Sequence, residues 1–551
     1  QRIKAHEAVE SGEWRERSLH SVIQKGVRAM KYFFKRLLRG LFSVVVAMCI
    51  IIILLFFVLD KTLIFAEDEQ YVKLSNNQKI TYMYTMWEKY GYLTRVTYND
   101  YLNGLVDAGE ITEEEKSAVA TIGRTAEKDS DEVRKYVDQF TKLYESKGYT
   151  ICRLDAVMAN KSRIATGGGQ TLFAYLNTPV LKRLGSFFSG LLTFDNIHYV
   201  QEDIGERKLT FTFYDPVYGG EKFSPAIIGN GTYHKYLLYC NDQFPYIHQN
   251  FVKLRLGTSF TVNKGIDAFE TMTQSQGTYV VHTNYYPTGL VAESADDLHT
   301  ATYMAGSREL NLVYADQFDD DYTNTNLVKD SRSKIYYSFI ISILGSLFTY
   351  LIGLPLGILM AKKKDTWVDN LGNAYVIFMI AVPSLAYYFM FKAFSINIGL
   401  PVIFSLDNPS TLMYVTPVLA SLAASVAGTM KWMRRYMVDQ MNSDYVKFAR
   451  AGGLTEGEIF TKHIFKNAAI PTVHGIPNTI IMALSGSIMM ERIYAIPGVG
   501  GLLIQAIGAY DNAVILGVAF FYGTLSIIGS ILGDILMSVM DPRISYTSKA
   551  R

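Results

Sequence analysis

Residues 41–59 read LFSVVVAMCIIIILLFFVL, an uncharged apolar run of 19 residues. A bilayer core about 30 Å thick requires roughly 20 apolar residues in an α-helix, so this run predicts a membrane-spanning helix. It is preceded by Lys31, Lys35, Arg36 and Arg39. The run is too long for a cleaved signal peptide, and no small-residue cleavage pattern follows it. We therefore expect this helix to anchor the chain in a membrane.

Five further apolar runs follow a long polar interval, and we expect spans at residues 335–360, 371–396, 412–430, 476–490 and 513–540. Hydrophobic residues make up 49% of the chain and charged residues 19%, which is too apolar for a disordered protein. The predicted fold class is an all-α polytopic membrane protein with six transmembrane helices and a large inserted mixed α/β domain. The expected units are a tail, 1–40; a first span, 41–59; the inserted domain, 67–330; a helical core, 335–540; and a second tail, 541–551.

The distribution of basic residues predicts the orientation, because Lys and Arg in short loops are retained in the cytoplasm. Segments 1–40, 362–370, 431–471 and 541–551 hold 23 Lys and Arg residues in total, whereas the short segments on the other side hold only Arg492. Both termini are thus expected inside and the inserted domain outside. The inserted domain has 25 basic and 35 acidic residues. The basic excess elsewhere flanks the spans, where lipid head groups are a simpler partner than nucleic acid.

The loop between the fourth and fifth spans has the pattern helix, glycine break, helix. Asn442 or Ser443 can cap a first helix, and Gly452 and Gly453 can end it in a left-handed turn. Thr455 and Glu458 have capping-box spacing, so we expect a second helix from Glu456 to Pro471.

Small residues in this loop, Ala449, Ala451 and Gly453, permit close approach of another surface. A short, firmly capped helix between rigid neighbours is suited to transmitting force to the membrane spans. The alternative is a plain helical hairpin that only connects two spans.

A second break, residues 496–501, follows the fifth span. Pro497 removes a backbone donor, and Gly498 and Gly500 release the chain. An amphipathic segment, 502–509, comes next. Non-helical backbone at membrane depth is tolerated only against protein or water, so this segment is a candidate gate or pore edge; an ordinary extracellular turn is the alternative.

The loop sequences ARAGG (449–453) and NAAIP (467–471) resemble the "EAA" loop of ABC-importer permeases, the segment that docks on the ATP-binding subunit. Residues 445–454, YVKFARAGGL, are most similar to the oligopeptide/dipeptide branch, although Lys447 stands where the motif has its Glu. The resemblance implies an ATPase-coupling loop made of Lys447, Ala449, Arg450, Ala451, Gly453, Leu454, Thr455, Glu456 and Glu458.

Other motifs of the same branch follow in order. Residues 486–500, GSIMMERIYAIPGVG, resemble its Glu and Pro-Gly segment, and Asp534 with DPRI (541–544) resembles its C-terminal end. Residues 35–38, KRLL, resemble the start of its first span, and parts of 236–260 resemble the enlarged external segment of Ami-type oligopeptide permeases of Gram-positive bacteria. The candidate gate or path residues are Glu491, Pro497, Gly498, Gly500 and Asp534.

The resemblance implies a type I ABC importer permease fold in a bacterial cell membrane. It also implies a second related permease, two ABC ATPases, an extracellular peptide-binding lipoprotein and a peptide substrate. The chain has no phosphate-binding loop, since Gly167–Gly169 with Gln170 and Thr171 lacks the lysine. ATP and Mg are therefore expected on the partner subunits, with no cofactor or metal in this chain. Hydrolysis would switch a cavity between outward and inward access.

The sequence does not indicate an enzyme. The stretch from His6 to Glu10 lacks the second histidine of a zinc protease, and no Gly-x-Ser-x-Gly elbow occurs in the inserted domain. The other functional classes left open are an importer of another solute and a membrane sensor with an extracellular ligand domain.

Several smaller features leave alternatives open. Asp534 can pair with a basic group of another span or face a peptide path, and pairing is favoured. Glu491 and Arg492 can stabilise the gate or only mark the interface. Cys49 lies in an apolar run, and Cys152 and Cys240 can pair if their domain is extracellular.

Within the inserted domain, residues 113–146 have a mainly helical pattern, and residues 208–214 and 278–282 alternate like strands. The domain is expected either to dock the binding protein or to act as a spacer that stabilises the outer face.

Overall fold

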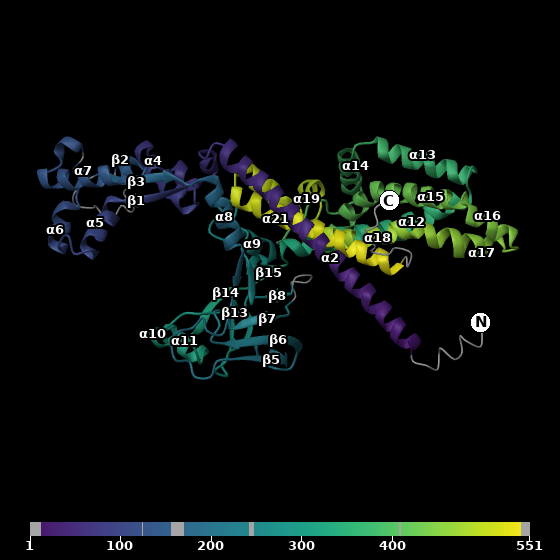
Figure 1. Ribbon diagram of the computed structural model, residues 1–551, viewed down its shortest axis with the longest axis horizontal. Helices are drawn as coiled ribbons and strands as arrows, with labels where there is room; N and C mark the ends of the chain where they lie inside the picture. Colours follow the sequence, from purple (N-terminus) through teal and green to yellow (C-terminus); the bar gives the residue numbers. More distant parts are fainter. Residues whose placement is uncertain (1–12, 124, 156–169, 242–246, 407–408, 541–551) are drawn as a thin grey trace.

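The computed structural model describes residues 13–123, 125–155, 170–241, 247–406 and 409–540. Figure 1 shows a long helical bundle built from both ends of the chain, with the inserted domain attached at one end of it. We call this end of the bundle the domain end. The opposite end, which carries α16 and α17, is called the loop end. The predicted glycine-rich segment 167–169, residues 1–12 and residues 541–551 lie outside the described residues.

The inserted domain separates the first helix of the bundle from the rest. The bundle elements are α2 Glu13–Ile53 with the π-helical turn η1 Leu54–Val58, α12 Lys334–Lys362, α13 Trp367–Ala381, α14 Ser384–Asn397, η5 Thr411–Tyr414 with α15 Val415–Met441, α18 Lys466–Met482 with η7 Ala483–Ser485, α19 Ile488–Tyr494, α20 Val499–Gly508 and α21 Asn512–Met540. Four helices in the described residues are long and apolar enough to cross a membrane, and two bent pairs bring the number to six if each pair is one span.

The predicted third span, 371–396, is not a single helix. The chain bends by 101° between α13 and α14. Val382 is extended (φ −80°, ψ 129°) and is followed by Pro383. A proline disfavours helical geometry in the residue before it and donates no hydrogen bond, and these two effects explain the bend.

The predicted fifth span, 476–490, begins too late and crosses a break. The helix α18 already begins at Lys466, and the chain bends by 42° before α19. Gly486 lies at the bend with φ +68°, where a Cβ atom would stand 1.8 Å from Glu491 Oε1. The requirement for a glycine there therefore has a cause in the tertiary structure, which helical pattern alone does not reveal.

Glycines bring the bundle helices into close contact. On α12, a Cβ atom at Gly353 or Gly357 would lie 2.9 Å from atoms of α15. On α21, a Cβ atom at Gly529 would lie 2.5 Å from Asn478 of α18. Small residues at helix contacts are typical of membrane proteins, in which close packing replaces hydrophobic burial as the main attraction between helices.

The first lobe of the inserted domain is a three-stranded antiparallel sheet, order β1-β3-β2, covered by helices. The predicted helical stretch 113–146 is confirmed, because it contains α6 and α7. The elements of this lobe are η2 Leu63–Phe65, α3 Glu69–Val72, α4 Asn76–Lys89, β1 Leu93–Thr97, α5 Tyr98–Asp107, α6 Glu113–Val119, η3 Ala126–Lys128, α7 Asp131–Ser146, β2 Thr150–Asp155 and β3 Gln170–Asn177.

The second lobe begins with α8 and contains a four-stranded sheet, β5-β6-β7-β8, and four two-stranded sheets. Its elements are α8 Val180–Gly190, β4 Leu192–Phe194, β5 Lys208–Tyr214, η4 Pro216–Tyr218, β6 Phe223–Asn230, β7 Tyr236–Tyr239, β8 His248–Gln249, β9 Val252–Leu254, α9 Ala268–Thr273, β10 Gln276–Tyr279, β11 His282–Tyr285, β12 Val291–Ser294, β13 Asp296–Tyr303, α10 Ser307–Leu310, α11 Leu312–Gln317, β14 Tyr322–Leu327 and β15 Lys329–Ser331.

One predicted strand of this lobe is confirmed and one is wrong. Residues 208–214 form β5. Residues 278–282 do not form one strand, because β10 pairs with β15 and β11 pairs with β12. The chain leaves one small sheet for another between Tyr279 and His282. The pairing of Cys152 and Cys240, which the sequence left open, does not occur in the structure, since both cysteines are free.

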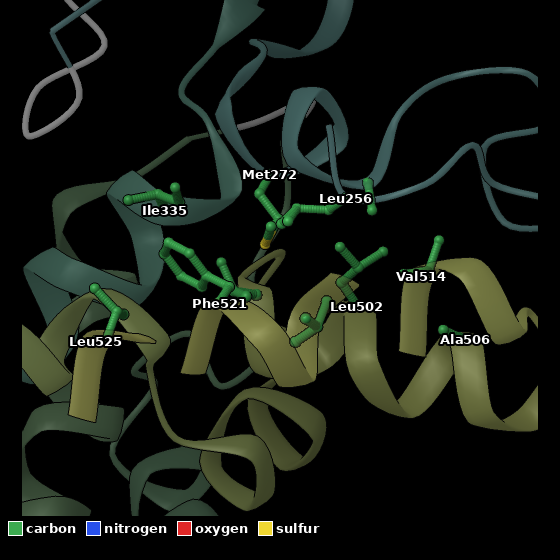
Figure 2. Packing of buried hydrophobic residues seen from close by; sticks show 11 residues of the cluster. Leu256, Met272, Ile335, Leu502, Ala506, Val514, Phe521 and Leu525 are labelled. Atoms are coloured by element: carbon green, nitrogen blue, oxygen red, sulfur yellow. The ribbon is translucent and has the colours of Figure 1, made fainter. Parts of the chain in front are cut away.

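A continuous apolar core joins the inserted domain to the bundle (Figure 2). Leu256 and Met272 of the second lobe are fully buried against Leu502 of α20 and Val514 of α21. Gly517 lies directly beneath, where a Cβ atom would meet Leu256 at 2.9 Å. The second lobe is thus packed onto α20 and α21 as a firm attachment.

Candidate functional site

At the loop end, two short helices join α15 to α18. They are α16 Asp444–Ala451 and α17 Glu456–Glu458, followed by the π-helical segment η6 Ile459–Phe465. Gly453 turns the chain with φ +82°. The Thr455 hydroxyl accepts from the Glu458 amide at 3.3 Å, and Glu458 Oε2 accepts from the Thr455 amide at 3.3 Å. The predicted glycine break and capping box are therefore confirmed.

Two local predictions differ from the structure. Ser443 occupies the N-cap position, but its hydroxyl donates to the Gln440 carbonyl at 2.5 Å and does not accept from α16. The second helix does not end at Pro471, because η6 and α18 continue it to Met482. Proline removes one hydrogen bond, and close packing of α18 on α21 compensates for that loss in a membrane helix.

One face of α16 fixes it to the bundle. Val446 and Ala449 are buried in a cluster with Met433 and Met437 of α15 and Ala361 of α12. The small side chain of Ala449 thus lets α16 approach its own bundle. Leu454 packs at the edge of the same cluster. Any force on α16 is carried to α12 and α15 through these contacts.

The other face of α16 is exposed. It presents Lys447, which binds Asp444 at 2.8 Å, and the small residue Ala451. Gly453, two residues after the helix, is also exposed. Phe448 is 77% exposed. A large aromatic side chain on the polar face of an amphipathic helix suggests a contact with another protein, and this signal could have been found from Val446 and Ala449, which mark the buried face.

A salt bridge crosses the glycine turn. Arg450 donates to the two carboxylate oxygens of Glu456 at 2.6 and 3.0 Å. This contact lowers the pKa of the Glu456 carboxyl and raises that of Arg450. Glu458 also accepts from Lys462 at 3.3 Å. The predicted loop residues therefore form one compact unit with a fixed outer surface.

At the domain end, Glu491 is enclosed by glycines. Its carboxylate is buried and accepts from Ser338 Oγ and from the Gly501 amide, each at 2.8 Å. A Cβ atom at Gly498 would lie 2.4 Å from Glu491 Oε2, and one at Gly500 would lie 3.1 Å from it. The structure thus brings Glu491, Gly498 and Gly500 together as the sequence motif suggested.

The break around Pro497 is shorter than predicted. The helix α19 ends at Tyr494, Ala495 has φ +53°, and α20 already begins at Val499. Gln276 of β10 donates from its amide to the Pro497 carbonyl at 3.0 Å and accepts from Lys334 Nζ at 2.7 Å. The inserted domain therefore holds this turn, which we call the α19–α20 elbow (residues 495–498), directly.

Asp511 is a second link to the inserted domain, and sequence analysis missed it. One of its oxygens, Oδ2, accepts from Ser259 Oγ at 2.6 Å and from the amides of Phe260, Thr261 and Val262 at 2.9 to 3.2 Å. The side chain is fully buried. In the sequence, the feature that could have identified Asp511 is its position as a single carboxylate between two apolar segments.

Asp534 of α21 belongs to a different group of contacts from Glu491. It forms an ion pair with Arg36 of α2 and lies 4.0 Å from His474 Nε2 of α18. The predicted pairing with a basic group of another span is therefore confirmed. Among the described residues, no group of three His, Cys, Asp or Glu side chains could hold a metal ion.

Known proteins resemble this chain along nearly all its length. Residues 353–546 match the family described as binding-protein-dependent transport system inner membrane component. The oligopeptide transport system permease protein AmiC of Streptococcus pneumoniae is 33% identical over 527 residues, covering 94% of this chain and 99% of AmiC. An alignment of that length necessarily includes the inserted domain.

Shorter relatives match a smaller part. The dipeptide transport system permease protein DppB of Bacillus subtilis is 28% identical over 213 residues, which is 38% of this chain and 68% of DppB. Among solved structures, the inward-facing MetNI methionine ABC transporter covers 38% of this chain at 17% identity with a TM-score of 0.31. On the family match and the full-length similarity to AmiC, the chain belongs to the binding-protein-dependent inner membrane components, the permeases of ABC importers with the type I fold.

Proposed function

We propose that this chain is a transmembrane permease subunit of an ATP-driven importer of oligopeptides. The observation that carries the proposal is the unit formed by α16, Gly453 and α17, which is fixed to α12 and α15 on one face and exposes Phe448 on the other. Such a unit can receive a push from an ATPase and pass it to the spans. The substrate class rests on the full-length similarity to an oligopeptide permease.

The full assembly would contain a second related permease, two ABC ATPases with ATP and Mg, and an extracellular peptide-binding lipoprotein. ATP hydrolysis would change the equilibrium between outward and inward access by binding one state better than the other. The α19–α20 elbow would be a hinge in this change, since Ala495 and Gly498 absorb the turn between two packed helices. Both termini would lie in the cytoplasm and the inserted domain outside the cell.

Substitution of exposed aromatic residues tests the coupling role of this loop. Phe448→Ser should abolish peptide-stimulated ATP hydrolysis by the reconstituted assembly while the protein remains folded, because Phe448 has few contacts within its own chain. Trp367→Ser is the matched control, since Trp367 is 74% exposed and begins α13. Equal stimulation in wild type and Phe448→Ser would contradict the assignment of this loop.

We propose that the inserted domain docks the peptide-binding lipoprotein. Its attachment to the bundle through Leu256, Met272 and Asp511 would hold a docked protein in a fixed position over α20 and α21. The alternative is a spacer that only stabilises the outer face. A photoreactive residue at Phe211, 56% exposed on β5, should cross-link to the binding protein, and one at Trp367 should not. A chain with residues 70–325 deleted that still assembles, docks the binding protein and imports peptide normally would contradict the docking role.

Purification and assay of the same assembly distinguish two other functions from peptide import. A sensor should co-purify with no ATPase. An importer of another solute should assemble with ATPases but show no stimulation by peptides. The similarity to AmiC and DppB favours peptides over these alternatives.

A further inference from the structure

A cavity of about 290 Å³ opens between α2 and α21 toward the loop end of the bundle. Its size is at the lower limit of small-molecule pockets, which are roughly 300–1,000 Å³. The two helices provide its lining, which is basic on α2 and combines hydroxyl and apolar groups on α21: Lys35, Arg36, Arg39, Ser43, Ser530 and Ile531.

The position of the cavity follows from how the two helices touch. A Cβ atom at Gly40 would lie 2.5 Å from Ile527, so α2 and α21 are in direct contact there. Lys35 and Arg39 are four residues apart and therefore lie on the same face of α2. Their side chains can reach a common ligand beside this contact.

The charges in the cavity do not cancel. Arg36 forms an ion pair with Asp534 and donates to Ser530 Oγ at 3.0 Å. Lys35 and Arg39 have no carboxylate partner among the residues that the structure describes. Like charges at this spacing repel each other in an isolated helix. An anion in the cavity would relieve this repulsion and receive two charged donors.

The surroundings of the cavity are apolar and face outward. Phe34 and Leu38, beside the basic residues on α2, are 61% and 70% exposed. Within a bilayer these side chains contact lipid tails. An anion that reaches Lys35 and Arg39 from this side would therefore be attached to an acyl chain.

We propose that the cavity between α2 and α21 binds the phosphate group of an anionic phospholipid, held by Lys35 and Arg39. Basic pockets between membrane helices on the cytoplasmic side are suited to such head groups. The Ser530 hydroxyl, which accepts from Arg36, retains a proton to donate to a phosphate oxygen. The assignment to the inner leaflet rests on the topology given under the proposed function, whereas binding itself does not.

The test is lipid retention by the full chain in nanodiscs made of equal parts phosphatidylcholine and phosphatidylglycerol. After extraction, native mass spectrometry counts the phosphatidylglycerol molecules that remain bound. The double variant Lys35→Gln/Arg39→Gln should retain phosphatidylglycerol roughly 30-fold less, since two basic residues near an anionic head group act nearly independently. Ser43→Leu, which fills the cavity and keeps the charges, should also lose retention.

The matched control is Lys362→Gln/Lys363→Gln, which removes two charges at the end of α12 outside the cavity. It should retain lipid like the wild type. Equal retention in the wild type and in both cavity variants would overturn the proposal and leave Lys35 and Arg39 as topology signals only. The proposal would be overturned in favour of a free phosphate by two results together. These are binding of inorganic phosphate in pure phosphatidylcholine nanodiscs and no preference for phosphatidylglycerol in the mixed nanodiscs. No ATPase is needed, so failure of this test is distinct from failure of the proposed import function.

Discussion

Glu491 is a buried carboxylate, and the glycines around it leave only enough room for its oxygens. Gly486 and Gly498 come so close that a methyl group at either position would overlap Glu491. The hydrogen bonds from Ser338 and Gly501 offset part of the cost of burying this polar group. The motif that contains Glu491 and the Pro-Gly pair therefore has a physical meaning as one carboxylate and its cradle.

We expect Gly498→Ala to destabilise the chain by about 1–3 kcal/mol, the usual cost of overpacking. Gly508→Ala, at the other end of α20, is the control, because nothing lies within 4 Å of its Cβ position. Thermal unfolding in nanodiscs measures both changes. A Gly498→Ala protein as stable as the control would show that the cradle adapts at no cost.

Asp511→Asn should lower stability by about 2 kcal/mol or more, since one carboxylate oxygen accepts several hydrogen bonds from the 259–262 loop and such charged bonds are each worth about 1.5–3 kcal/mol. The control is Asp107→Asn, at an exposed position on α5. Limited proteolysis should cut the variant faster within 256–267. Unchanged cleavage would mean that the apolar core alone holds the inserted domain.

At the scale of single residues, the sequence predicted those functional residues that lie close together in one motif. Glu491, Gly498 and Gly500 lie within nine residues of one another and were grouped correctly. Asp511 was missed because its partners, including Ser259, are about 250 residues away in the chain. Only the fold brings such distant groups together.

Among the elements, the loop of α16 and α17, proposed to couple to the ATPases, has the Arg450–Glu456 salt bridge across its glycine turn. Either single reversal, Arg450→Glu or Glu456→Arg, should place like charges together, loosen the turn between α16 and α17, and weaken peptide stimulation of the ATPases. The double reversal should restore much of the stimulation, because it restores the pair. A double variant no better than the worse single variant would show that these side chains act on the partner individually.

Helix positions were predictable from apolar runs, but helix breaks were less so. The 101° bend at Pro383 lies inside a uniformly apolar segment, where hydropathy conceals the backbone signal. Conversely, Pro471 was predicted to end a helix, but α18 continues beyond this residue to Met482. Proline ends a helix only when packing does not compensate, and packing on a neighbouring helix cannot be deduced from one segment.

At the scale of the whole molecule, the inserted domain should respond to pH through His299. This side chain is 2.8 Å from Asp215 Oδ2 and 3.4 Å from Asp297 Oδ1. Burial lowers its pKa, but hydrogen bonds to the two carboxylates outweigh burial and raise the pKa to about 9. Because the folded value exceeds the unfolded one, near 6.5, the stabilisation is complete below pH 6.5 and is lost as the pH rises through 9.

Thermal unfolding of the full chain should therefore show a decline in stability between pH 6.5 and 9 that is absent in His299→Gln. His248 lies in the same aromatic stack and has its pKa lowered to about 4, mainly by burial. Its contribution has the opposite sign, since it is complete above pH 6.5 and is lost as the pH falls toward 4. An equal decline in wild type and His299→Gln above pH 6.5 would assign the effect to other groups.

The chain as a whole links two distant surfaces. The inserted domain is packed on α20 and α21 and holds the α19–α20 elbow through Gln276, whereas α16 is packed on α12 and α15 at the other end. Composition and span pattern predicted that such a domain exists. They could not predict its firm attachment, which depends on contacts between segments far apart in sequence.

The central claim is that the loop containing Gly453 couples ATP hydrolysis to peptide import. The most direct test is peptide-stimulated ATP hydrolysis by the reconstituted assembly, comparing wild type, Gly453→Asp and Gly457→Asp. Both glycines are exposed with open space around them, but only Gly453 has a positive φ. Loss of stimulation in Gly453→Asp alone, with assembly retained, is the predicted result. Full stimulation in Gly453→Asp would contradict the claim.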